Sequence, residues 1–347
     1  MSDFPEATTS ESTPAGSAPT ESRPTIPPEK ITQAGEIIGR IKSEVGKAVV
    51  GQEAVIEQVL IALIASGHVL LEGVPGLGKT LLVRALAKTM QGSFARIQFT
   101  PDLMPSDVTG HSMFDAATNS FSVRKGPVFA NLLLADEINR APAKTQSALL
   151  EVMQEYQVTI EGEAHPMPLP FLTLATQNPV ELEGTYPLPE AQLDRFLLKV
   201  EVAYPSVEDE AALVRRVTEG QIGDALRLDG VSAVVKPETV LALQRLAAML
   251  TVDARIHDYA VRIVRATRTW PGVAIGAGPR GSIGLVRAAR ARALMAARDF
   301  VTPDDVKRVA LPALRHRVSL APDAQLEGQS TDGVLTAIVD SIEAPRT

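Results

Sequence analysis

The sequence predicts an α/β fold in which a parallel sheet, covered by helices on both faces, precedes a smaller helical domain. Short aliphatic runs alternate with segments of helical apolar spacing, and this order is typical of a parallel sheet in an αβα sandwich. The predicted strands are residues 69–71, 95–99, 132–135, 171–176 and 196–200. Beyond Pro205 no strong strand signal remains, so we expect only helices there. They are predicted at about 207–217, 237–250, 256–268, 280–298 and 303–315.

The N-terminal segment differs from the rest of the chain. It is rich in Ser, Thr, Pro and Glu, and after the first methionine only Phe4 and Ile26 are large aliphatic or aromatic residues. Such a composition cannot bury enough apolar surface to offset the entropy of ordering, so we expect disorder. A chain of 347 residues also exceeds one ordinary domain. We therefore predict a disordered tail (1–30), an α/β domain (31–205) and a helical domain (206–347).

The α/β domain contains further predicted elements. Apolar residues recur at helical spacing over 37–45 and over 55–64, so two helices are expected before the first strand. Another helix is predicted at 143–155. Residues 101–129 are irregular, and 120–124 would form one arm of a hairpin. A second hairpin is predicted at 157–160 with the turn Glu161-Gly162.

The composition restricts the class of protein. Hydrophobic residues make up 45% of the chain, and the formal net charge is −7, which argues against a protein that mainly coats nucleic acid. There is no cysteine and there are five scattered histidines, so neither a disulfide nor a metal cluster is expected. No apolar run approaches the ~20 residues that span a bilayer. The N-terminus lacks a basic region followed by an apolar core. We therefore expect a cytoplasmic protein without a membrane span.

Residues 73–80 fill every fixed position of the phosphate-loop pattern G-x-x-x-x-G-K-[ST]. They lie between a predicted strand and a predicted helix, so backbone N–H groups and the helix N-terminus would face a phosphate chain. Lys79 would contact the β- and γ-phosphates of a nucleotide, and the Thr80 hydroxyl would bind Mg²⁺. The alternative, a glycine-rich turn that binds nothing, fits this context poorly. The predicted cofactor-binding residues of the loop are Gly73, Pro75, Gly76, Gly78, Lys79, Thr80 and Leu81.

The strand at 132–135 ends on two acids, Asp136 and Glu137. A strand that ends on a carboxylate delivers it to the edge where parallel sheets bind ligands. Asp136 would hold Mg²⁺, and Glu137 would orient and deprotonate the attacking water. The alternative is a helix N-terminus, where acids are favoured. Downstream of a complete phosphate loop, the catalytic interpretation is much the stronger.

Three other positions carry weaker signals. Asn178 follows the next strand and would reach the attacking water or the γ-phosphate, although Asn-Pro is also an ordinary turn signal. Arg195 belongs to an Asp-Arg pair between a short helix and a strand, and such a pair is more often a solvated ion pair. Arg280 lies at a predicted helix start, where a cation opposes the helix dipole. That cost suggests an anionic partner for Arg280.

Taken in order, these motifs resemble those of the AAA+ ATPases, and within that class those of the MoxR family. The resemblance covers about residues 35–340 and is carried by segments 50–52, 73–80, 136–144, 175–179, 190–196 and 278–280. The sequence Gly-Pro-Arg-Gly at 278–281 departs from relatives, which more often show Ser-Pro-Arg-Ala, but keeps the arginine. The resemblance implies an AAA+ αβα sandwich with a parallel sheet, followed by a smaller all-helical lid domain.

The resemblance also implies roles for individual residues. It places Gly51 and Gln52 near the adenine, and makes Asn178 the sensor-1 residue, Arg195 the arginine finger and Arg280 the sensor-2 arginine. Arg140 is a weaker candidate for a second arginine that acts on a neighbouring subunit, and a salt bridge is its expected role.

The family implies a homo-oligomeric ring, commonly a hexamer, that binds ATP and Mg²⁺ between neighbouring subunits. It is associated with chaperone-like maturation of protein complexes, often with metal insertion, and with partners that carry a von Willebrand factor A domain. The alternative is a nucleic-acid motor or loader, whose support is the run of basic residues from Arg287 to Arg317. A solvated face or a subunit contact is the simpler explanation of that run. A third hypothesis, a nucleotide-gated scaffold, is disfavoured by Glu137.

Overall fold

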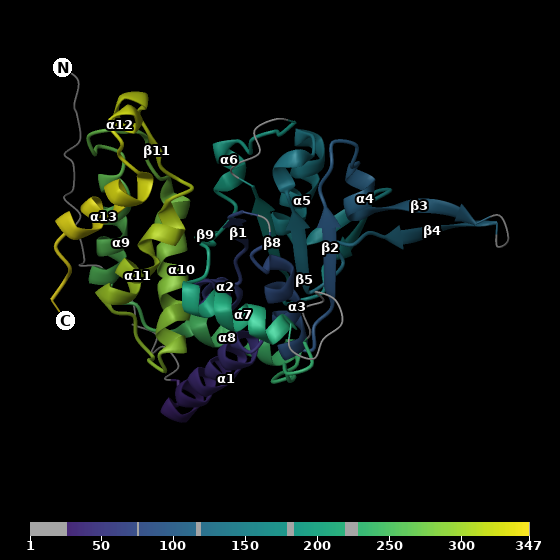
Figure 1. The fold of residues 1–347 in the computed structure, drawn as a ribbon, viewed down its shortest axis with the longest axis horizontal. Helices are drawn as coiled ribbons and strands as arrows, with labels where there is room; N and C mark the ends of the chain where they lie inside the picture. Colours follow the sequence, from purple (N-terminus) through teal and green to yellow (C-terminus); the bar gives the residue numbers. More distant parts are fainter. Residues whose placement is uncertain (1–25, 75, 116–118, 179–183, 219–227, 347) are drawn as a thin grey trace, which may run out of the picture.

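The computed structural model describes residues 26–74, 76–115, 119–178, 184–218 and 228–346. An α/β domain lies beside a mostly helical domain, and a two-stranded hairpin projects from the far side of the α/β domain (Figure 1). The α/β class predicted from the sequence is confirmed. The predicted tail falls mostly outside the described residues, and its last part is helical, because the first helix begins at Pro28.

The central sheet has five strands, and every pair in it is parallel. In spatial order they are β2 (Phe94–Gln98), β5 (Leu132–Asp136), β8 (Leu172–Gln177), β1 (Val69–Glu72) and β9 (Leu198–Glu201). The register aligns Glu72 with Gln177 and Glu201, and Gln98 with Asp136. The carboxyl ends of all five strands therefore meet at one edge of the sheet.

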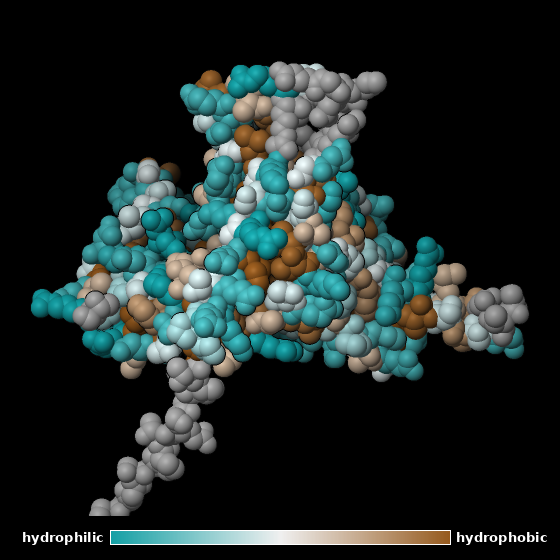
Figure 2. All heavy atoms as spheres, turned by 90° about the horizontal axis from the view of Figure 1, so that it is seen from below, coloured by the Kyte–Doolittle hydropathy of each residue, from teal (hydrophilic) through white to brown (hydrophobic). Residues whose placement is uncertain are grey.

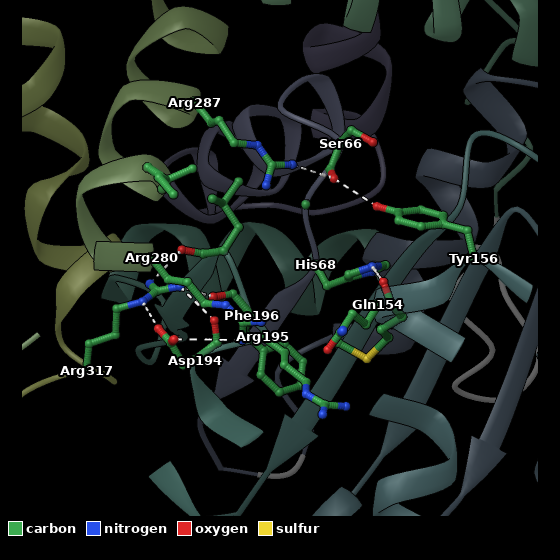
Figure 3. Close-up of a pocket in the computed structure, with 15 residues that line it drawn as sticks. Ser66, His68, Gln154, Tyr156, Asp194, Arg195, Phe196, Arg280, Arg287 and Arg317 are labelled. Atoms are coloured by element: carbon green, nitrogen blue, oxygen red, sulfur yellow. Dashed lines mark hydrogen bonds and ion pairs between the residues drawn. The ribbon is translucent and has the colours of Figure 1, made fainter. Parts of the chain in front are cut away.

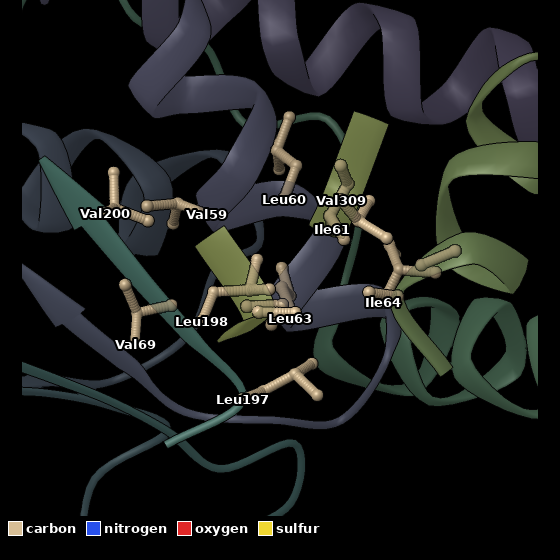
Figure 4. Packing of buried hydrophobic residues seen from close by; sticks show 14 of the residues in the cluster. Val59, Leu60, Ile61, Leu63, Ile64, Val69, Leu197, Leu198, Val200 and Val309 are labelled. Atoms are coloured by element: carbon tan, nitrogen blue, oxygen red, sulfur yellow. The ribbon is translucent and has the colours of Figure 1, made fainter. Parts of the chain in front are cut away.

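Both faces of the sheet are covered, because successive side chains of a strand point to opposite faces. Leu132 and Leu134 of β5 join one buried cluster, whereas Leu133 and Ala135 join another. The first face is covered by α2 (Glu53–Ile64) and α3 (Lys79–Thr89), against which α1 (Pro28–Gly46) packs, and the second face is covered by α5 (Ala143–Glu155). Figure 4 shows Leu63 of α2 packed beside Leu198 of β9.

Two hairpins interrupt the α/β order, as the sequence predicted. The first consists of β3 (Gly110–Asp115) and β4 (Ser120–Lys125) and follows the short helix α4 (Pro105–Thr109). The second consists of β6 (Gln157–Ile160) and β7 (Glu163–Pro166). Exposed apolar side chains lie on the projecting first hairpin, which is at the right of Figure 2, and they are Met113, Phe114, Phe121 and Val123.

The second domain contains more elements than the sequence predicted. Its helices are α7 (Val207–Thr218), α8 (Pro237–Met249), α9 (Ala254–Ala266), α10 (Pro279–Met295), α11 (Pro303–Leu314), α12 (Pro322–Leu326) and α13 (Thr331–Ser341). The expectation of helices alone was wrong, because β10 (Val273–Ile275) and β11 (Ser319–Leu320) pair antiparallel. Strands this short contain too few residues to show an alternating pattern.

Two short helices complete the fold. A 3₁₀ helix (Ile138–Arg140) follows β5, and α6 (Glu190–Leu193) precedes β9. The second domain packs closely on the first, since α10 contacts both α1 and α2. None of the described helices combines the length and the apolar composition that a membrane span requires.

His68, the residue before β1, is fully enclosed between neighbouring elements. Its Nε2 donates to the Met153 carbonyl at 3.0 Å, and its Nδ1 accepts from the Thr173 N–H at 3.0 Å. Burial lowers the pKa of His68 from 6.5 to about 4. Burial also lowers the pKa of His316 well below its usual value. Both imidazoles are therefore neutral in the folded protein near neutral pH.

This burial makes the stability of the fold dependent on pH. Between about pH 6.5 and pH 4, His68 is protonated in the unfolded chain but neutral in the folded chain. The free energy of unfolding therefore decreases as the pH falls through that window. The shift corresponds to about 3 kcal/mol of unfolding free energy at pH 4. Urea unfolding of the wild-type protein and His68→Gln between pH 7 and pH 4.5 measures it. The variant should lose less stability over this range, and equal losses in both proteins would contradict the prediction.

Candidate nucleotide-binding site

The loop that joins β1 to α3 has the backbone that its glycines predict. Gly76 and Gly78 have φ values of +86° and +75°, a region that other residues rarely adopt. Gly78 caps the N-terminus of α3. A Cβ at Gly73 would lie 2.6 Å from the Val202 carbonyl oxygen, so only glycine fits there. Pro75, which the sequence also assigned to nucleotide binding, lies outside the described residues.

Lys79 is folded back over this loop. Its Nζ donates to the carbonyl oxygen of Gly73. Burial lowers the pKa of Lys79, and the nearby carboxylates of Asp136, Glu137 and Glu72 oppose that shift. The ammonium group is therefore half-buried between the loop and the acids, where it would contact the phosphates of a bound nucleotide.

A cavity of about 380 Å³ lies between the loop and the carboxyl ends of three strands. We call it the phosphate-loop cavity. Its described lining residues are Gly73, Gly76, Leu77, Gly78, Lys79, Thr80, Leu81, Arg96, Gln98, Asp136, Glu137, Thr176 and Asn178. The structure thus brings the loop together with both acids of β5 and with Asn178, which is buried at the end of β8. The size is in the usual range for small-molecule sites.

Asp136 is held by two side chains that the sequence did not single out. Its Oδ1 accepts a hydrogen bond from the Thr176 hydroxyl at 2.6 Å. Its Oδ2 accepts from Arg96, with distances of 2.7 Å to Nη2 and 3.2 Å to Nε. The carboxylate is consequently oriented by groups on both neighbouring strands.

Glu137 occupies a left-handed backbone conformation with φ of +57°, an unusual one for this residue type. Its N–H donates to the Thr176 hydroxyl at 2.8 Å. Its Oε2 accepts from Gln98 Nε2 at 2.7 Å and lies 3.2 Å from Arg140 Nη1. Arg140 therefore forms a salt bridge beside the cavity, the role that the sequence favoured for it. Strained backbone of this kind is found preferentially at functional sites.

Sequence reasoning missed Arg96, Gln98 and Thr176. A signal was available for the first two, because Arg96 and Gln98 are two residues apart and so lie on one side of β2. The register then pairs Gln98 with Asp136 at the same sheet edge. The pairing of β2 with β5 was not inferred from the sequence, so these two polar side chains were not placed beside the acids of β5.

Gly51 and Gln52 lie next to the phosphate-loop cavity rather than in its wall. Gln52 is buried, and its Nε2 donates to the Leu77 carbonyl at 2.9 Å, which ties the segment to the loop. Gly51 has φ of +73° and packs against Asp209 of α7, where a Cβ would lie 2.7 Å from the Asp209 Cβ. Among the described lining residues of the cavity, neither appears.

Arg195 and Arg280 are not in the phosphate-loop cavity. Both line a second cavity of about 310 Å³, between the α6–β9 junction and α10, together with Arg287 and Arg317 (Figure 3). We call it the arginine cavity. Arg280 Nη1 lies 3.9 Å from Asp194 Oδ2. The side chain of Arg195 makes no hydrogen bond or ion pair with any other residue that the structure describes. The alternative explanation of this segment, an ion pair between Asp194 and Arg195, does not hold, because Arg317 pairs with Asp194 instead.

The fold and the phosphate-loop cavity define a P-loop ATPase of the AAA+ class. Two family models match the chain: the ATPase family associated with various cellular activities (AAA) over residues 68–198, and the AAA lid domain over residues 265–338. The chain is 44% identical to the chaperone MoxR1 of Mycobacterium tuberculosis, over 99% of this chain and 92% of that one. It belongs to the MoxR family of AAA+ ATPases, and it binds and hydrolyses ATP.

Two other comparisons agree with this assignment. The chain is 46% identical to the uncharacterized protein YeaC of Bacillus subtilis, over 89% of this chain and 95% of that one. A crystal structure of a protein from Cytophaga hutchinsonii superimposes with a TM-score of 0.84 at 44% identity, covering 92% of this chain and 98% of that one. The shared fold therefore includes both domains.

Proposed function

We propose that the chain is the subunit of a homo-oligomeric ring, a hexamer, that uses ATP hydrolysis to act as a chaperone on protein clients. The observation that carries the proposal is the separation of the two cavities. The phosphate-loop cavity contains the groups that bind ATP and activate water, whereas Arg195 and Arg280 line a different surface. A neighbouring copy of the chain that docked its nucleotide against the arginine cavity would complete the site. The name of MoxR1 supports the chaperone activity.

Within one subunit, we assign a task to each group of the phosphate-loop cavity. Lys79 binds the β- and γ-phosphates, and the loop N–H groups surround them. Glu137 accepts the proton of the attacking water, and Asn178 orients that water or the γ-phosphate. Gln98 and Arg140 hold the Glu137 carboxylate in place until a nucleotide is bound.

The same cavity fits Mg²⁺. The Thr80 hydroxyl and the Asp136 carboxylate both line it, and Mg²⁺ favours oxygen ligands supplied by one or two side chains together with phosphates. Among the described residues no group of three or more His, Cys, Asp and Glu side chains is placed to hold a metal without a phosphate. When bound, the ion would neutralise charge on the β- and γ-phosphates. Arg96, which donates to Asp136 Oδ2, and Thr176, which donates to Oδ1, would orient that carboxylate toward the ion.

Arg195 is assigned to the nucleotide of the neighbouring subunit. The residue is partly exposed, and no described residue of its own chain pairs with its guanidinium. A cation brought to the γ-phosphoryl group stabilises the charge that develops there, an effect of roughly 10³–10⁵ in rate for well-studied nucleotide hydrolases. Arg280, whose side chain is 51% exposed, lines the same cavity and would act on the same nucleotide.

The domain limits also enter the proposal. We assign residues 31–205 to the nucleotide-binding domain and residues 206–347 to the lid, with residues 1–30 as a tail. We also propose a partner with a von Willebrand factor A domain, a role in metal insertion and a cytoplasmic location. The support for these three points is the sequence resemblance.

The nucleic-acid hypothesis loses support from the contacts of the basic run. Arg298 forms a two-pronged ion pair with Asp305, at 2.6 and 2.7 Å. Arg315 pairs with Asp332, and Arg287 donates to two backbone carbonyls. Arg298 and Arg315 are therefore held in ion pairs rather than on a free solvated face, whereas Arg287 is exposed, as the simpler explanation expected. Side chains held in this way are not free to neutralise phosphates along a nucleic acid, on which such binding depends.

The choice between a protein client and a nucleic acid can be measured directly. The steady-state ATPase rate of the purified protein is recorded alone, with duplex DNA, and with the purified product of a neighbouring gene that encodes a von Willebrand factor A domain. We expect the protein partner to raise the rate and DNA to leave it unchanged. Stimulation by DNA that weakens steeply with added salt would instead support the motor or loader. Lys79→Ala serves as the control for contaminating ATPases.

A further inference from the structure

Arg317, three residues beyond the end of α11, is a buried cation with an unusual number of partners. Its side chain is 4% exposed. Nε donates to Asp194 Oδ1 at 2.7 Å, and Nη2 donates to the carbonyl oxygens of Asp194 at 3.1 Å and Phe196 at 2.7 Å. Nη1 donates to the carbonyl oxygens of Leu197, at 3.2 Å, and Ala313. Each of the three guanidinium nitrogens therefore donates at least one hydrogen bond.

These contacts explain how the charge is tolerated in a buried position. Burial lowers the pKa of Arg317, and the carboxylate of Asp194 opposes the shift. A buried charge is stable only when it is paired and its hydrogen bonds are made. The planar fork of arginine meets that requirement with little freedom of movement, which lysine cannot reproduce.

The segment that Arg317 holds is the one that carries Arg195. The residues immediately before and after Arg195 are Asp194 and Phe196, and the carbonyl groups of both accept from the same nitrogen of Arg317. Nε2 of the adjacent His316 lies 3.0 Å from the Phe196 oxygen as well. Figure 3 shows the Arg317 guanidinium directed at Asp194, at the base of Arg195. The backbone carbonyls of both neighbours of Arg195 are consequently held from the lid.

A second lid residue meets the same carboxylate. Arg280, at the start of α10, lies 3.9 Å from Asp194 Oδ2, while Arg317 occupies Oδ1. Asp194 therefore joins two elements of the lid to the α6–β9 junction. A displacement of the lid would move this carboxylate and, with it, the backbone from which Arg195 projects.

We propose that Arg317 is a positioning residue for the ATPase reaction. It fixes the orientation of Arg195 toward the neighbouring subunit's nucleotide and makes that orientation depend on the position of the lid. The inference rests on the proposed role of Arg195 in a neighbouring site. It differs from a purely structural role, because a structural residue would stabilise the fold or the ATP site without acting through Arg195.

The test is a double-mutant cycle in the full-length protein, with single-turnover and steady-state ATP hydrolysis as readouts. Arg317→Gln should lower kcat by about 10- to 100-fold, because a displacement of about 1 Å at a reacting group can cost about 100-fold. The KM for ATP should stay the same, because Arg317 lies outside the phosphate-loop cavity and its side chain, 4% exposed in the arginine cavity, is already bound to residues 194–197. In the Arg195→Ala background, Arg317→Gln should have no further effect on the rate, since the side chain that it positions is already missing.

Arg315→Gln is the matched control. Arg315 is also a lid arginine with a mostly buried side chain, 11% exposed, but it pairs with Asp332 and Glu201 rather than with the segment around Arg195. It should lower the melting temperature while kcat stays near that of the wild-type protein. Sedimentation of both variants establishes that they assemble as the wild-type protein does.

The outcomes separate the two proposals. If Arg195→Ala is defective but Arg317→Gln lowers kcat by the same factor in both backgrounds, Arg317 acts independently and the inference is overturned. A wild-type kcat for Arg317→Gln overturns it as well. If Arg195→Ala itself turns over normally, the proposed role of Arg195 fails, and this inference fails with it. Should Arg317→Gln not fold, Arg317→Lys, which keeps the charge beside Asp194 but lacks the fork, gives the same comparisons.

Discussion

Replacing Glu137 with glutamine lowers ATP turnover by about 100-fold or more and leaves ATP binding intact. Loss of a general base costs typically 10²–10⁴ in rate. The amide keeps the shape of the side chain and can still accept the hydrogen bond that Gln98 now donates to Oε2. The phosphate-loop cavity therefore keeps its form while the proton acceptor is lost. Steady-state ATPase assays give the turnover, and equilibrium binding of a fluorescent ATP analogue gives the affinity.

Two comparisons make this result specific. Lys79→Ala should lose affinity for the nucleotide, because the ammonium contacts the phosphates in the bound state. Glu201→Gln removes a carboxylate at the end of another parallel strand, β9, outside the phosphate-loop cavity, and should change neither quantity. Normal turnover by Glu137→Gln at saturating ATP would show that another group takes the proton.

Mixed assemblies of two inactive proteins should regain activity if Arg195 acts on the neighbouring subunit. Arg195→Ala subunits keep the complete phosphate-loop cavity but supply no finger, and Glu137→Gln subunits have the reverse defect. Each protein alone should bind ATP and turn over very slowly, since an arginine finger contributes roughly 10³–10⁵ in rate. After co-assembly from dissociated subunits, some interfaces pair an intact Glu137 with an intact Arg195. The ATPase rate of the mixture should then exceed the sum of the separate rates.

Subunit exchange must be shown first, for example by energy transfer between labelled subunits, because unmixed rings would also show no recovery. With exchange established, the absence of recovery at every mixing ratio would mean that Arg195 acts within its own chain or has no part in hydrolysis. That no described residue pairs with its guanidinium would then need another explanation. Recovery that scales with the fraction of mixed interfaces supports an obligate oligomer.

The sequence by itself determined the features that depend on contiguous residues. The phosphate loop is one such feature, because residues 73–80 contain its glycines and the start of the helix, and the strand immediately precedes them. The placement of Asp136 and Glu137 is another, since a buried strand that ends on acids must present them at the carboxyl edge of a parallel sheet. The α/β class and both hairpins followed from local apolar patterns in the same way.

Tertiary structure decided what depends on residues far apart in the chain. Arg96, Gln98 and Thr176 surround the acids of β5 only because β2 and β8 flank that strand. The pairing of β10 with β11 joins segments more than 40 residues apart, each too short to be recognised alone. The sequence equally gave no sign that Arg195 and Arg280 would share a cavity away from the phosphate loop.

The arginines of the lid show the physical reason most clearly. From the sequence, a solvated face or a subunit contact was the simpler explanation of the basic run, because an isolated charge is more stable in water than in a protein interior. Arg317 is buried nonetheless, since the fold brings it an acid and three carbonyl groups from residues 194–197, about 120 positions earlier in the chain. Local composition determines which side chains carry charge. Their partners, and hence their burial and their role, are set by long-range packing.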